Sequence, residues 1–375
     1  MTRDGVKVII AAGGSGGHIF PAIALGRKLK ASDNGNEVLF IGSRRALDRR
    51  LYEKEGVQFQ LLTANKLPYK PSFDFIPFFV KLLFDIARSF FIIVRYRPDA
   101  VAGFGGYVSY PVIAVASVLR IPSVVHEQNA VPGRANKALF RLADRVAISF
   151  EETRRSLGPD RDKAVVTGNP IRTEIFRDDR TGGIRRFGLD LNKFTILVIG
   201  GSQGARVLNT TFIEALALAD PKVKADLQVI HIAGVKDYER ALKEYAGAGV
   251  DHRVHSFIDR IEEAYAAADL VVTRSGASAI FELAYLGKPM ILVPYPFAAS
   301  HQAENAAVFA RDGAAVLLDE TGLSGEIFGD AILGLMNDRQ RLRDMGSAAK
   351  RQSVPDAAGI LANEIFKLIN DRRKA

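Results

Sequence analysis

The chain has 375 residues, of which 48% are hydrophobic and 25% are charged, a balance typical of globular proteins. A chain of this length is too long for a single hydrophobic core of ordinary size, so it predicts two domains of roughly 150–200 residues each. The absence of cysteine excludes disulfides and thiolate metal sites, and the net charge of +9 predicts attraction to polyanions such as nucleic acid, anionic lipid or phosphorylated substrates.

The N-terminal apolar run is short and enters a glycine turn, so it predicts a first strand rather than a signal peptide. An uninterrupted apolar stretch of about 18–20 residues is absent, so we expect no membrane-spanning helix. Apolar runs alternate with helix-length segments along the chain. The predicted strands are Val6–Ala12, Glu37–Ile41, Gln58–Leu62, Ala100–Phe104, Ser123–Glu127, Arg145–Phe150, Ala164–Thr167, Thr195–Ile199, Gln228–Ala233, Arg253–Phe257, Leu270–Thr273, Pro289–Val293 and Ala314–Leu318.

Most of these runs are rich in Val and Ile and lack period-two alternation. This composition indicates strands that are buried on both faces, as in parallel sheets covered by helices. The pattern therefore predicts a doubly wound α/β fold that occurs twice.

A glycine-rich turn follows the first strand of each half. Gly13-Gly14-Ser15-Gly16-Gly17-His18 follows the first run, and Gly200-Gly201-Ser202-Gln203-Gly204 follows the run that ends at Ile199. Backbone N–H groups at such turns suit phosphate. The first turn is not a dinucleotide fingerprint, because Ile19 stands where the third glycine would be. Neither turn is a P-loop, because no Gly-Lys-Ser/Thr sequence follows. Nicotinamide dehydrogenases and P-loop NTPases are thus disfavoured.

Other unusual segments also follow predicted strands, namely 103–107, 126–129, 168–170 and 273–276. Because ligands of open α/β sheets bind at the carboxyl ends of strands, we expect these segments to form the site. His18 begins a predicted helix, where the dipole favours the neutral imidazole, so it is our first candidate for a general base. Glu127 is the second candidate.

Two segments of the second half suggest sugar recognition. Ser275 is a predicted helix cap, and Glu282 follows within the same helix, where a carboxylate suits the two hydroxyls of a ribose. The polar segment 297–305 contains Gln302, whose amide suits sugar hydroxyls.

Lys66–Arg97 combines many Phe residues with basic side chains. Its apolar residues recur at helical spacing, which predicts an amphipathic helix that docks on an anionic membrane surface rather than a span. A helix of the first domain's core is the alternative. No His/carboxylate spacing typical of a metal site is present, and Asp160-Arg161-Asp162 reads as a solvated turn, so we expect no metal and no cofactor.

Six motifs in this order resemble the peptidoglycan N-acetylglucosaminyltransferases of glycosyltransferase family 28. They are GGSGGHIFPAIAL, GFGGYVSYP, HEQNAVPGRANK, GNPIR, GGSQGARVLN and RSGASAIFE, which span residues 13–282. The resemblance implies a GT-B fold, with two Rossmann-like doubly wound domains whose parallel sheets face a central cleft. We expect residues 1–170, with a C-terminal helix at about 352–375, to bind the acceptor and the membrane, and residues 171–351 to bind the UDP-sugar donor.

The resemblance also implies roles for individual residues in binding UDP-N-acetylglucosamine. In the first domain the residues expected to line the donor's sugar side are Ser15, Gly16, Gly17 and Asn129. Ser202 and Arg172 would approach the nucleotide sugar, and Ile258 would meet the uracil through its backbone. The residues expected to present helix N-terminal amides to the diphosphate are Ala277, Ser278, Ala279, Ile280 and Phe281. Glu282 would bind the ribose and Gln302 the sugar.

The implied reaction is inverting transfer of N-acetylglucosamine to the 4-hydroxyl of the muramoyl-pentapeptide of lipid I, an undecaprenyl diphosphate. The product is lipid II with a β-1,4 linkage, made without metal at the cytoplasmic side of the bacterial plasma membrane by a peripheral protein. Three alternatives remain at this point: a diacylglycerol glycosyltransferase of similar fold, a non-hydrolysing sugar-nucleotide epimerase, and a nucleic-acid-binding protein, which the basic charge alone favours.

Overall fold

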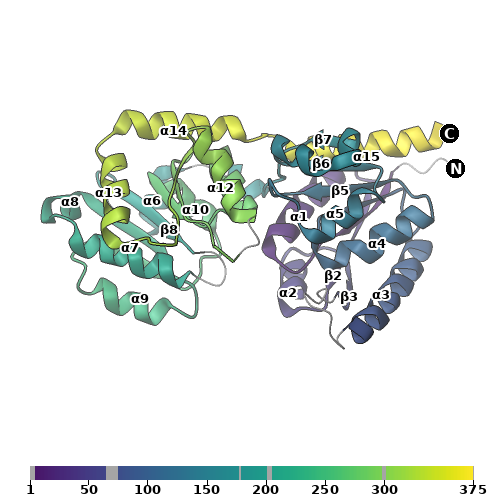
Figure 1. Ribbon diagram of the computed structural model, residues 1–375, viewed down its shortest axis with the longest axis horizontal. Helices are drawn as coiled ribbons and strands as arrows, with labels where there is room; N and C mark the ends of the chain where they lie inside the picture. Colours follow the sequence, from purple (N-terminus) through teal and green to yellow (C-terminus); the bar gives the residue numbers. More distant parts are fainter. Residues whose placement is uncertain (1–4, 65–74, 177–178, 201–204, 298–300, 375) are drawn as a thin grey trace. The chain divides into compact units, whose positions relative to one another are not determined.

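The computed structural model describes residues 5–64, 75–176, 179–200, 205–297 and 301–374 (Figure 1). The chain divides into two compact units, Met1–Arg172 with Val354–Ala375, and Thr173–Ser353. Each described unit is built on a parallel sheet with helices on both faces. The expected α/β architecture of two doubly wound domains is therefore confirmed.

Among the described residues, the first unit contains a seven-stranded sheet with the order β3-β2-β1-β4-β5-β6-β7. Its strands are β1 (Lys7–Ala11), β2 (Glu37–Ser43), β3 (Phe59–Leu62), β4 (Ala100–Gly103), β5 (Ser123–Glu127), β6 (Arg145–Ile148) and β7 (Ala164–Val166). Its α-helices are α1 (Gly16–Ser32), α2 (Ala46–Lys54), α3 (Phe75–Tyr96), α4 (Gly106–Val118), α5 (Arg134–Phe140) and α15 (Ala357–Lys374), and η1 (Glu151–Ser156) and η2 (Gly158–Lys163) are 3₁₀-helices.

Strand β1 is buried on both faces. Val8 and Ile10 join a core formed with α1, α2 and α15, whereas Ile9 and Ala11 join a second core formed with α3, α4 and α5. Because successive side chains of a strand point to opposite faces, a strand in this position must be apolar at every residue. This explains why the sequence shows a continuous apolar run here.

The described part of the second unit contains a six-stranded sheet with the order β10-β9-β8-β11-β12-β13. Its strands are β8 (Phe194–Ile199), β9 (Leu227–Ile232), β10 (Asp251–His255), β11 (Leu270–Thr273), β12 (Met290–Leu292) and β13 (Ala315–Leu317). Its helices are η3 (Thr173–Phe176), α6 (Arg180–Arg186), α7 (Arg206–Leu218), α8 (Pro221–Asp226), α9 (Tyr238–Tyr245), α10 (Ile261–Ala267), α11 (Ala277–Tyr285), α12 (His301–Arg311), α13 (Gly325–Met336) and α14 (Arg339–Gln352).

Strand order reverses at one place in each sheet. In the first unit β1 pairs with both β2 and β4, and in the second unit β8 pairs with both β9 and β11. The two glycine turns of the sequence begin where β1 and β8 end. Since open α/β sheets bind ligands at the carboxyl side of this switch point, the fold places the first turn where a ligand is expected. The second turn begins at Gly200, and its residues 201–204 lie outside the described residues.

Candidate active site

In the first unit, the turns after β1 and β4 pack directly against each other. Gly106 has φ +72°, and a Cβ placed there would lie 2.5 Å from the carbonyl oxygen of Gly13. Any side chain at Gly106 would therefore be strained and would push the two turns apart. The glycines of GFGG therefore bring the β4 turn against the β1 turn, and with it against His18.

His18 lies in the first turn of α1 and is half-buried. Its Nδ1 is 3.0 Å from the carbonyl oxygen of Gly13, and Ser15 Oγ lies 3.3 Å from the same nitrogen. A carbonyl only accepts, so Nδ1 carries the proton and donates to Gly13. In the neutral ring this tautomer places the lone pair on Nε2, as a general base requires.

Glu127, at the end of β5, is 1% exposed and its carboxylate is surrounded by donors. Oε1 accepts from the backbone N–H and the side-chain amide of Asn129 at 2.9 and 3.0 Å. Oε2 accepts from the backbone N–H of Gly133 at 3.1 Å and from Asn136 Nδ2 at 2.8 Å. These bonds hold the 127–136 segment in place, so the geometry fits Glu127 better as a positioning residue than as a proton acceptor.

The histidine next to Glu127 is fully buried and neutral. His126 Nε2 donates to the carbonyl of Gly168 at 3.0 Å, and Nδ1 accepts from Gln128 Nε2 at 3.1 Å. Burial lowers the pKa of His126 to about 4 from the ordinary 6.5, and the hydrogen bond to Gly168 only partly opposes this. His126 thus joins β5 to the segment after β7, and its role is structural.

Two buried amide oxygens near Glu127 have no hydrogen-bond partner among the described residues, Gln128 Oε1 and Asn136 Oδ1. Their orientation is fixed because both NH₂ groups donate inward, Gln128 to Phe104 O at 2.9 Å and Asn136 to Glu127. A Cβ at Gly105 would lie 3.2 Å from Asn136 Oδ1 and 3.3 Å from His18 Nε2. The absent side chain of Gly105 therefore leaves room where a hydroxyl could donate to Asn136 beside His18.

The sequence motifs did not single out Asn136 as a site residue. The signal that could have found it is its place in the helix that directly follows the 126–129 segment, because the first turn of α5 returns to the end of β5. An amide in that turn falls within reach of Glu127.

In the second unit, β11 leads into the N-terminus of α11. Gly276 is the N-cap of this helix, whereas Ser275 Oγ donates to the backbone carbonyl of Gln302 at 2.7 Å. The predicted capping role of Ser275 is therefore wrong, because the N-cap lies one residue later and the Ser275 hydroxyl joins the start of α11 to α12. The first turn of α11 contains the segment 277–280, whose amides were assigned to the diphosphate.

Glu282 lies on α11 and is 4% exposed, which excludes a solvated helix face. Its Oε2 accepts from the hydroxyl of Tyr265 on α10 at 3.1 Å. Gln302 begins α12, and its Oε1 accepts from the backbone N–H of Tyr295 at 3.0 Å. This bond orients the Gln302 amide and makes its NH₂ the group that can donate to a sugar.

The loops around α11 are held by a buried arginine. Arg274 is 8% exposed, forms an ion pair with Glu320 and donates to the carbonyls of Val293 and Pro294 at 3.0 and 3.2 Å. It thereby joins the segments that follow β11, β12 and β13. Arg274 belongs to one of the sequence motifs, but the motif alone did not indicate this role.

The other residues expected to contact the substrates lie on several different elements. Ile258 is half-buried after β10, and Arg172 lies over the Phe20 ring of α1, with its guanidinium 4.8 Å from the ring centroid. Asn129 and the segment 15–17 lie at the switch point of the first unit. Ser202 falls outside the described residues.

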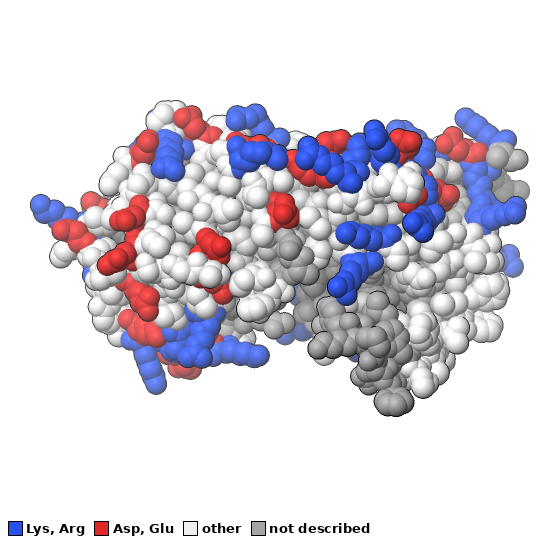
Figure 2. Space-filling model, in the orientation of Figure 1, with Lys and Arg blue, Asp and Glu red and all other residues white. Residues whose placement is uncertain are grey.

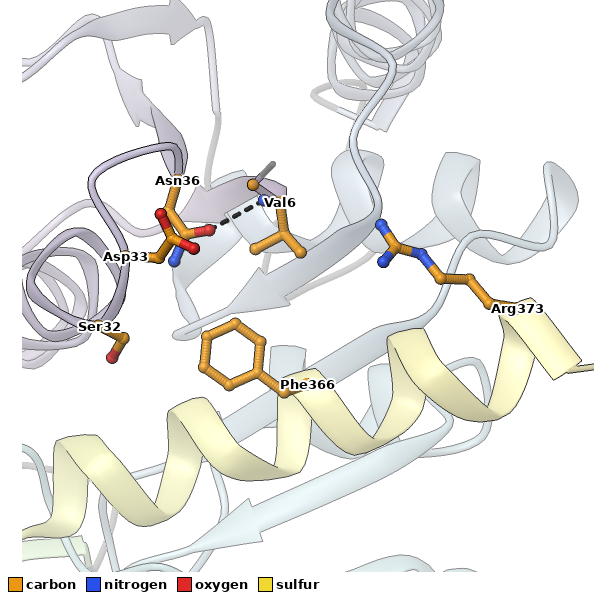
Figure 3. Close-up of a pocket in the computed structure, with 7 residues that line it drawn as sticks. Val6, Ser32, Asp33, Asn36, Phe366 and Arg373 are labelled. Atoms are coloured by element: carbon orange, nitrogen blue, oxygen red, sulfur yellow. Dashed lines mark hydrogen bonds between the residues drawn. The ribbon is translucent and has the colours of Figure 1, made fainter. Parts of the chain in front are cut away.

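A separate cavity of about 400 Å³ opens at the amino ends of β1 and β2, the edge opposite the glycine turns (Figure 3). Figure 3 shows Phe366 and Arg373 of α15 on one side and Ser32, Asp33 and Asn36 on the other, with Asn36 Oδ1 accepting from the N–H of Val6. Because open α/β sheets bind ligands at the carboxyl edge, we do not assign the site to this cavity.

Helix α3 presents a long apolar face to the surface. Leu83 is 65% exposed and Phe91 70% exposed, and the others that face outward are Ile76, Phe79, Val80, Phe84, Phe90 and Val94. The visible surface over α3 is predominantly white in the space-filling view (Figure 2). Asp85, on the same helix, is buried and accepts from the backbone N–H and the hydroxyl of Thr63 at 2.9 and 2.6 Å. The carboxylate therefore anchors α3 to β3.

None of the described helices is long and apolar enough to cross a membrane. The part of Lys66–Arg97 at 66–74 lies outside the described residues.

Comparison with known proteins connects this geometry to one family. Residues 8–148 match the glycosyltransferase family 28 N-terminal domain, and residues 195–360 match the family's C-terminal domain. The UDP-N-acetylglucosamine–N-acetylmuramyl-(pentapeptide) pyrophosphoryl-undecaprenol N-acetylglucosamine transferase of Halothermothrix orenii is 37% identical over 98% of this chain and 100% of its own. The transferase of the same name from Geobacter sulfurreducens is 39% identical over 96% and 98%.

Solved structures show the same fold. A crystal structure of MurG from Acinetobacter baumannii matches with a TM-score of 0.76 at 30% identity, covering 96% of this chain and 99% of that one. A UDP-GlcNAc 2-epimerase from Neisseria meningitidis, bound to UDP-GlcNAc, matches with a TM-score of 0.70 at 13% identity, covering 96% and 100%. The second likeness concerns the fold alone.

Proposed function

The chain belongs to glycosyltransferase family 28, and we propose that it transfers N-acetylglucosamine from UDP-N-acetylglucosamine to the muramoyl-pentapeptide of lipid I. The observation that carries this activity is similarity over nearly the full length to transferases of that name, at 37–39% identity. The product is lipid II with a β-1,4 linkage.

The proposed reaction is a single in-line displacement. The 4-hydroxyl of N-acetylmuramic acid attacks the anomeric carbon of the donor, the bond to the UDP oxygen breaks, and the configuration inverts. His18 Nε2 takes the hydroxyl proton, a role supported by the Nδ1 bond to Gly13 that places the lone pair on this atom. Asn136 Oδ1, close to the same point, accepts a hydrogen bond from the acceptor sugar.

The second unit is the proposed donor site. Backbone N–H groups in the first turn of α11 stabilise the charge that grows on the diphosphate as it leaves. Glu282 binds the ribose hydroxyls, the Gln302 NH₂ binds the sugar, and the Ile258 backbone binds the uracil. The proposal also keeps Ser15, Gly16, Gly17, Asn129, Arg172 and Ser202 as substrate contacts.

We further propose that the exposed face of α3 docks on an anionic membrane surface and places the enzyme peripherally, where its lipid-linked acceptor is found. Each apolar side chain that leaves water contributes about 1.5–3 kcal/mol, and each nearby basic residue adds about 1 kcal/mol. Lys81 and Arg95 are exposed on the same helix and supply such charges.

The experiment that tests this function compares acceptors. Purified protein is incubated with labelled UDP-N-acetylglucosamine, without added metal, and with either a lipid I analogue or diacylglycerol. Label in the lipid I analogue alone is the expected result. Label in diacylglycerol would favour the other lipid transferase, and epimerised nucleotide sugar without transfer would favour the epimerase.

A further inference from the structure

A buried carboxylate lies beneath the first glycine turn. Asp48 belongs to the first turn of α2 and is 0% exposed. The turn after β1 was expected to present its N–H groups to a ligand, yet the N–H of Gly14 points at this carboxylate, with both oxygens at 3.0 Å. Oδ2 also accepts from the N–H and hydroxyl of Ser43 at 2.9 and 2.6 Å.

The same helix makes a second contact with the turn. Tyr52, one helical turn after Asp48, is fully buried, and its hydroxyl donates to the carbonyl of Ala12 at 2.7 Å. Gly13 is required here, because a Cβ at that residue would lie 2.4 Å from Asp48 Oδ2. Residues 12–14 are thus held from below by two side chains on one face of α2.

Asp48 and His18 bind opposite sides of one peptide group. The N–H of Gly14 and the carbonyl of Gly13 belong to the same planar unit, and they point in opposite directions because the peptide is trans. Asp48 accepts from the N–H, and His18 Nδ1 donates to the carbonyl at 3.0 Å. A charged acceptor on the N–H side fixes the peptide plane and strengthens the carbonyl as an acceptor.

We propose that Asp48 is a positioning residue that orients His18 through the Gly13–Gly14 peptide, an inference that rests on the proposed function. It takes up the Gly14 N–H that a phosphate would otherwise bind and places a negative charge beneath the turn. The turn is therefore organised by an internal anion and presents His18 to an uncharged sugar hydroxyl.

The test compares Asp48→Asn and Asp48→Ala with wild type in the lipid I assay. Both variants should lower kcat by about 10–100-fold, since small misplacement of a catalytic group has effects of this size, and leave the KM for UDP-N-acetylglucosamine within about twofold. Added formate should restore part of the kcat of Asp48→Ala by filling the vacated anion position. Glu53→Gln removes an exposed carboxylate from the same helix and should behave as wild type.

A second readout does not depend on activity. Imidazole ¹⁵N chemical shifts should show His18 as the Nδ1–H tautomer in the wild type and as a mixture in Asp48→Asn. Unchanged kcat and tautomer in both variants would overturn the role of Asp48. The role of Asp48 would also be overturned if kcat fell only in proportion to the fraction of folded protein and formate did not restore it. If the wild type makes no product, the proposed function is refuted instead. The tautomer of His18 would still test whether Asp48 orients the imidazole.

Discussion

The hydroxyl of Tyr265 donates to Oε2 of Glu282 at 3.1 Å, which joins the carboxylate proposed for ribose to the neighbouring helix α10. One oxygen of this buried carboxylate is already held by a fixed donor. The side chain therefore loses little further conformational freedom when its other oxygen binds a ligand. This relationship favours Glu282 as a preorganised ribose acceptor.

Glu282→Gln should therefore raise the KM for UDP-N-acetylglucosamine by about 10–100-fold, because a hydrogen bond to a charged group contributes about 1.5–3 kcal/mol. Tyr265→Phe keeps the carboxylate and should raise the KM less. Steady-state kinetics with varied donor, together with UDP binding by calorimetry, measures both. A normal donor KM in Glu282→Gln would remove Glu282 from the ribose site.

His18→Gln should lower kcat by about 10²–10⁴-fold, because it removes the general base. The KM for the donor should change little, since the proposed donor contacts are mainly in the second unit. The acidic limb of the pH–rate profile should also disappear. An unchanged turnover would eliminate His18 as the base.

Glu127→Gln tests the alternative base. Its new NH₂ group would face N–H donors that now bind the carboxylate, so the free energy of unfolding should fall by about 1–3 kcal/mol. Turnover should fall as the 127–136 segment shifts, but the acidic limb should persist. Loss of that limb in Glu127→Gln, and not in His18→Gln, would reverse the two assignments.

Stability should fall below neutral pH because of two buried histidines. Burial lowers the pKa of His126 to about 4, and burial lowers that of His231 to about 3, from 6.5. The unfolded chain takes up these protons as pH falls below about 6.5, whereas the folded chain stays neutral until its own pKa is reached. Each histidine should thus lower the free energy of unfolding by about 2 kcal/mol at pH 5.

Urea unfolding at pH 7.5 and pH 5 measures this effect. His231 lies in the second unit, where it binds Tyr245 and Asn209 at 2.8 and 2.9 Å. Replacement of His126 with Gln should reduce the pH dependence attributed to the first unit, although it lowers stability at both pH values. Equal stability of the wild type at both pH values would contradict the assignment of these imidazoles as neutral.

Leu83→Glu should weaken binding to anionic vesicles by about 10–100-fold, since burial of one such side chain contributes about 1.5–3 kcal/mol. Leu218→Glu is a matched control, because Leu218 is also 65% exposed but lies on α7 of the second unit. Vesicle co-sedimentation compares the two variants. Equal losses, or none in Leu83→Glu, would refute docking through α3.

The strands were predictable because burial on both sheet faces leaves a strong local pattern. All thirteen predicted strands occur among the described residues, with ends that shift by a few residues, as at Val6–Ala12 against Lys7–Ala11. The first glycine turn was also located correctly, since it begins where the strand order of the first sheet reverses.

The parts of the site that depend on tertiary contacts were not predictable. Asp48 reads as an ordinary acid in the first turn of a polar helix, and only the fold brings it within 3.0 Å of Gly14. The hydroxyl of Ser275 was expected to cap the following helix, but the N-cap is Gly276, and the Ser275 hydroxyl donates to the carbonyl of Gln302 on α12. Spacing along the chain carries no information on such contacts.

Formation of a defined disaccharide is the observation on which the proposed activity depends. The purified protein, UDP-N-acetylglucosamine and a lipid I analogue are incubated, and the product linkage is determined by NMR alongside the UDP released. We expect a β-1,4-linked N-acetylglucosaminyl-muramoyl product in equal amount to UDP. Release of UDP without this disaccharide, or a product with retained anomeric configuration, would contradict the assignment.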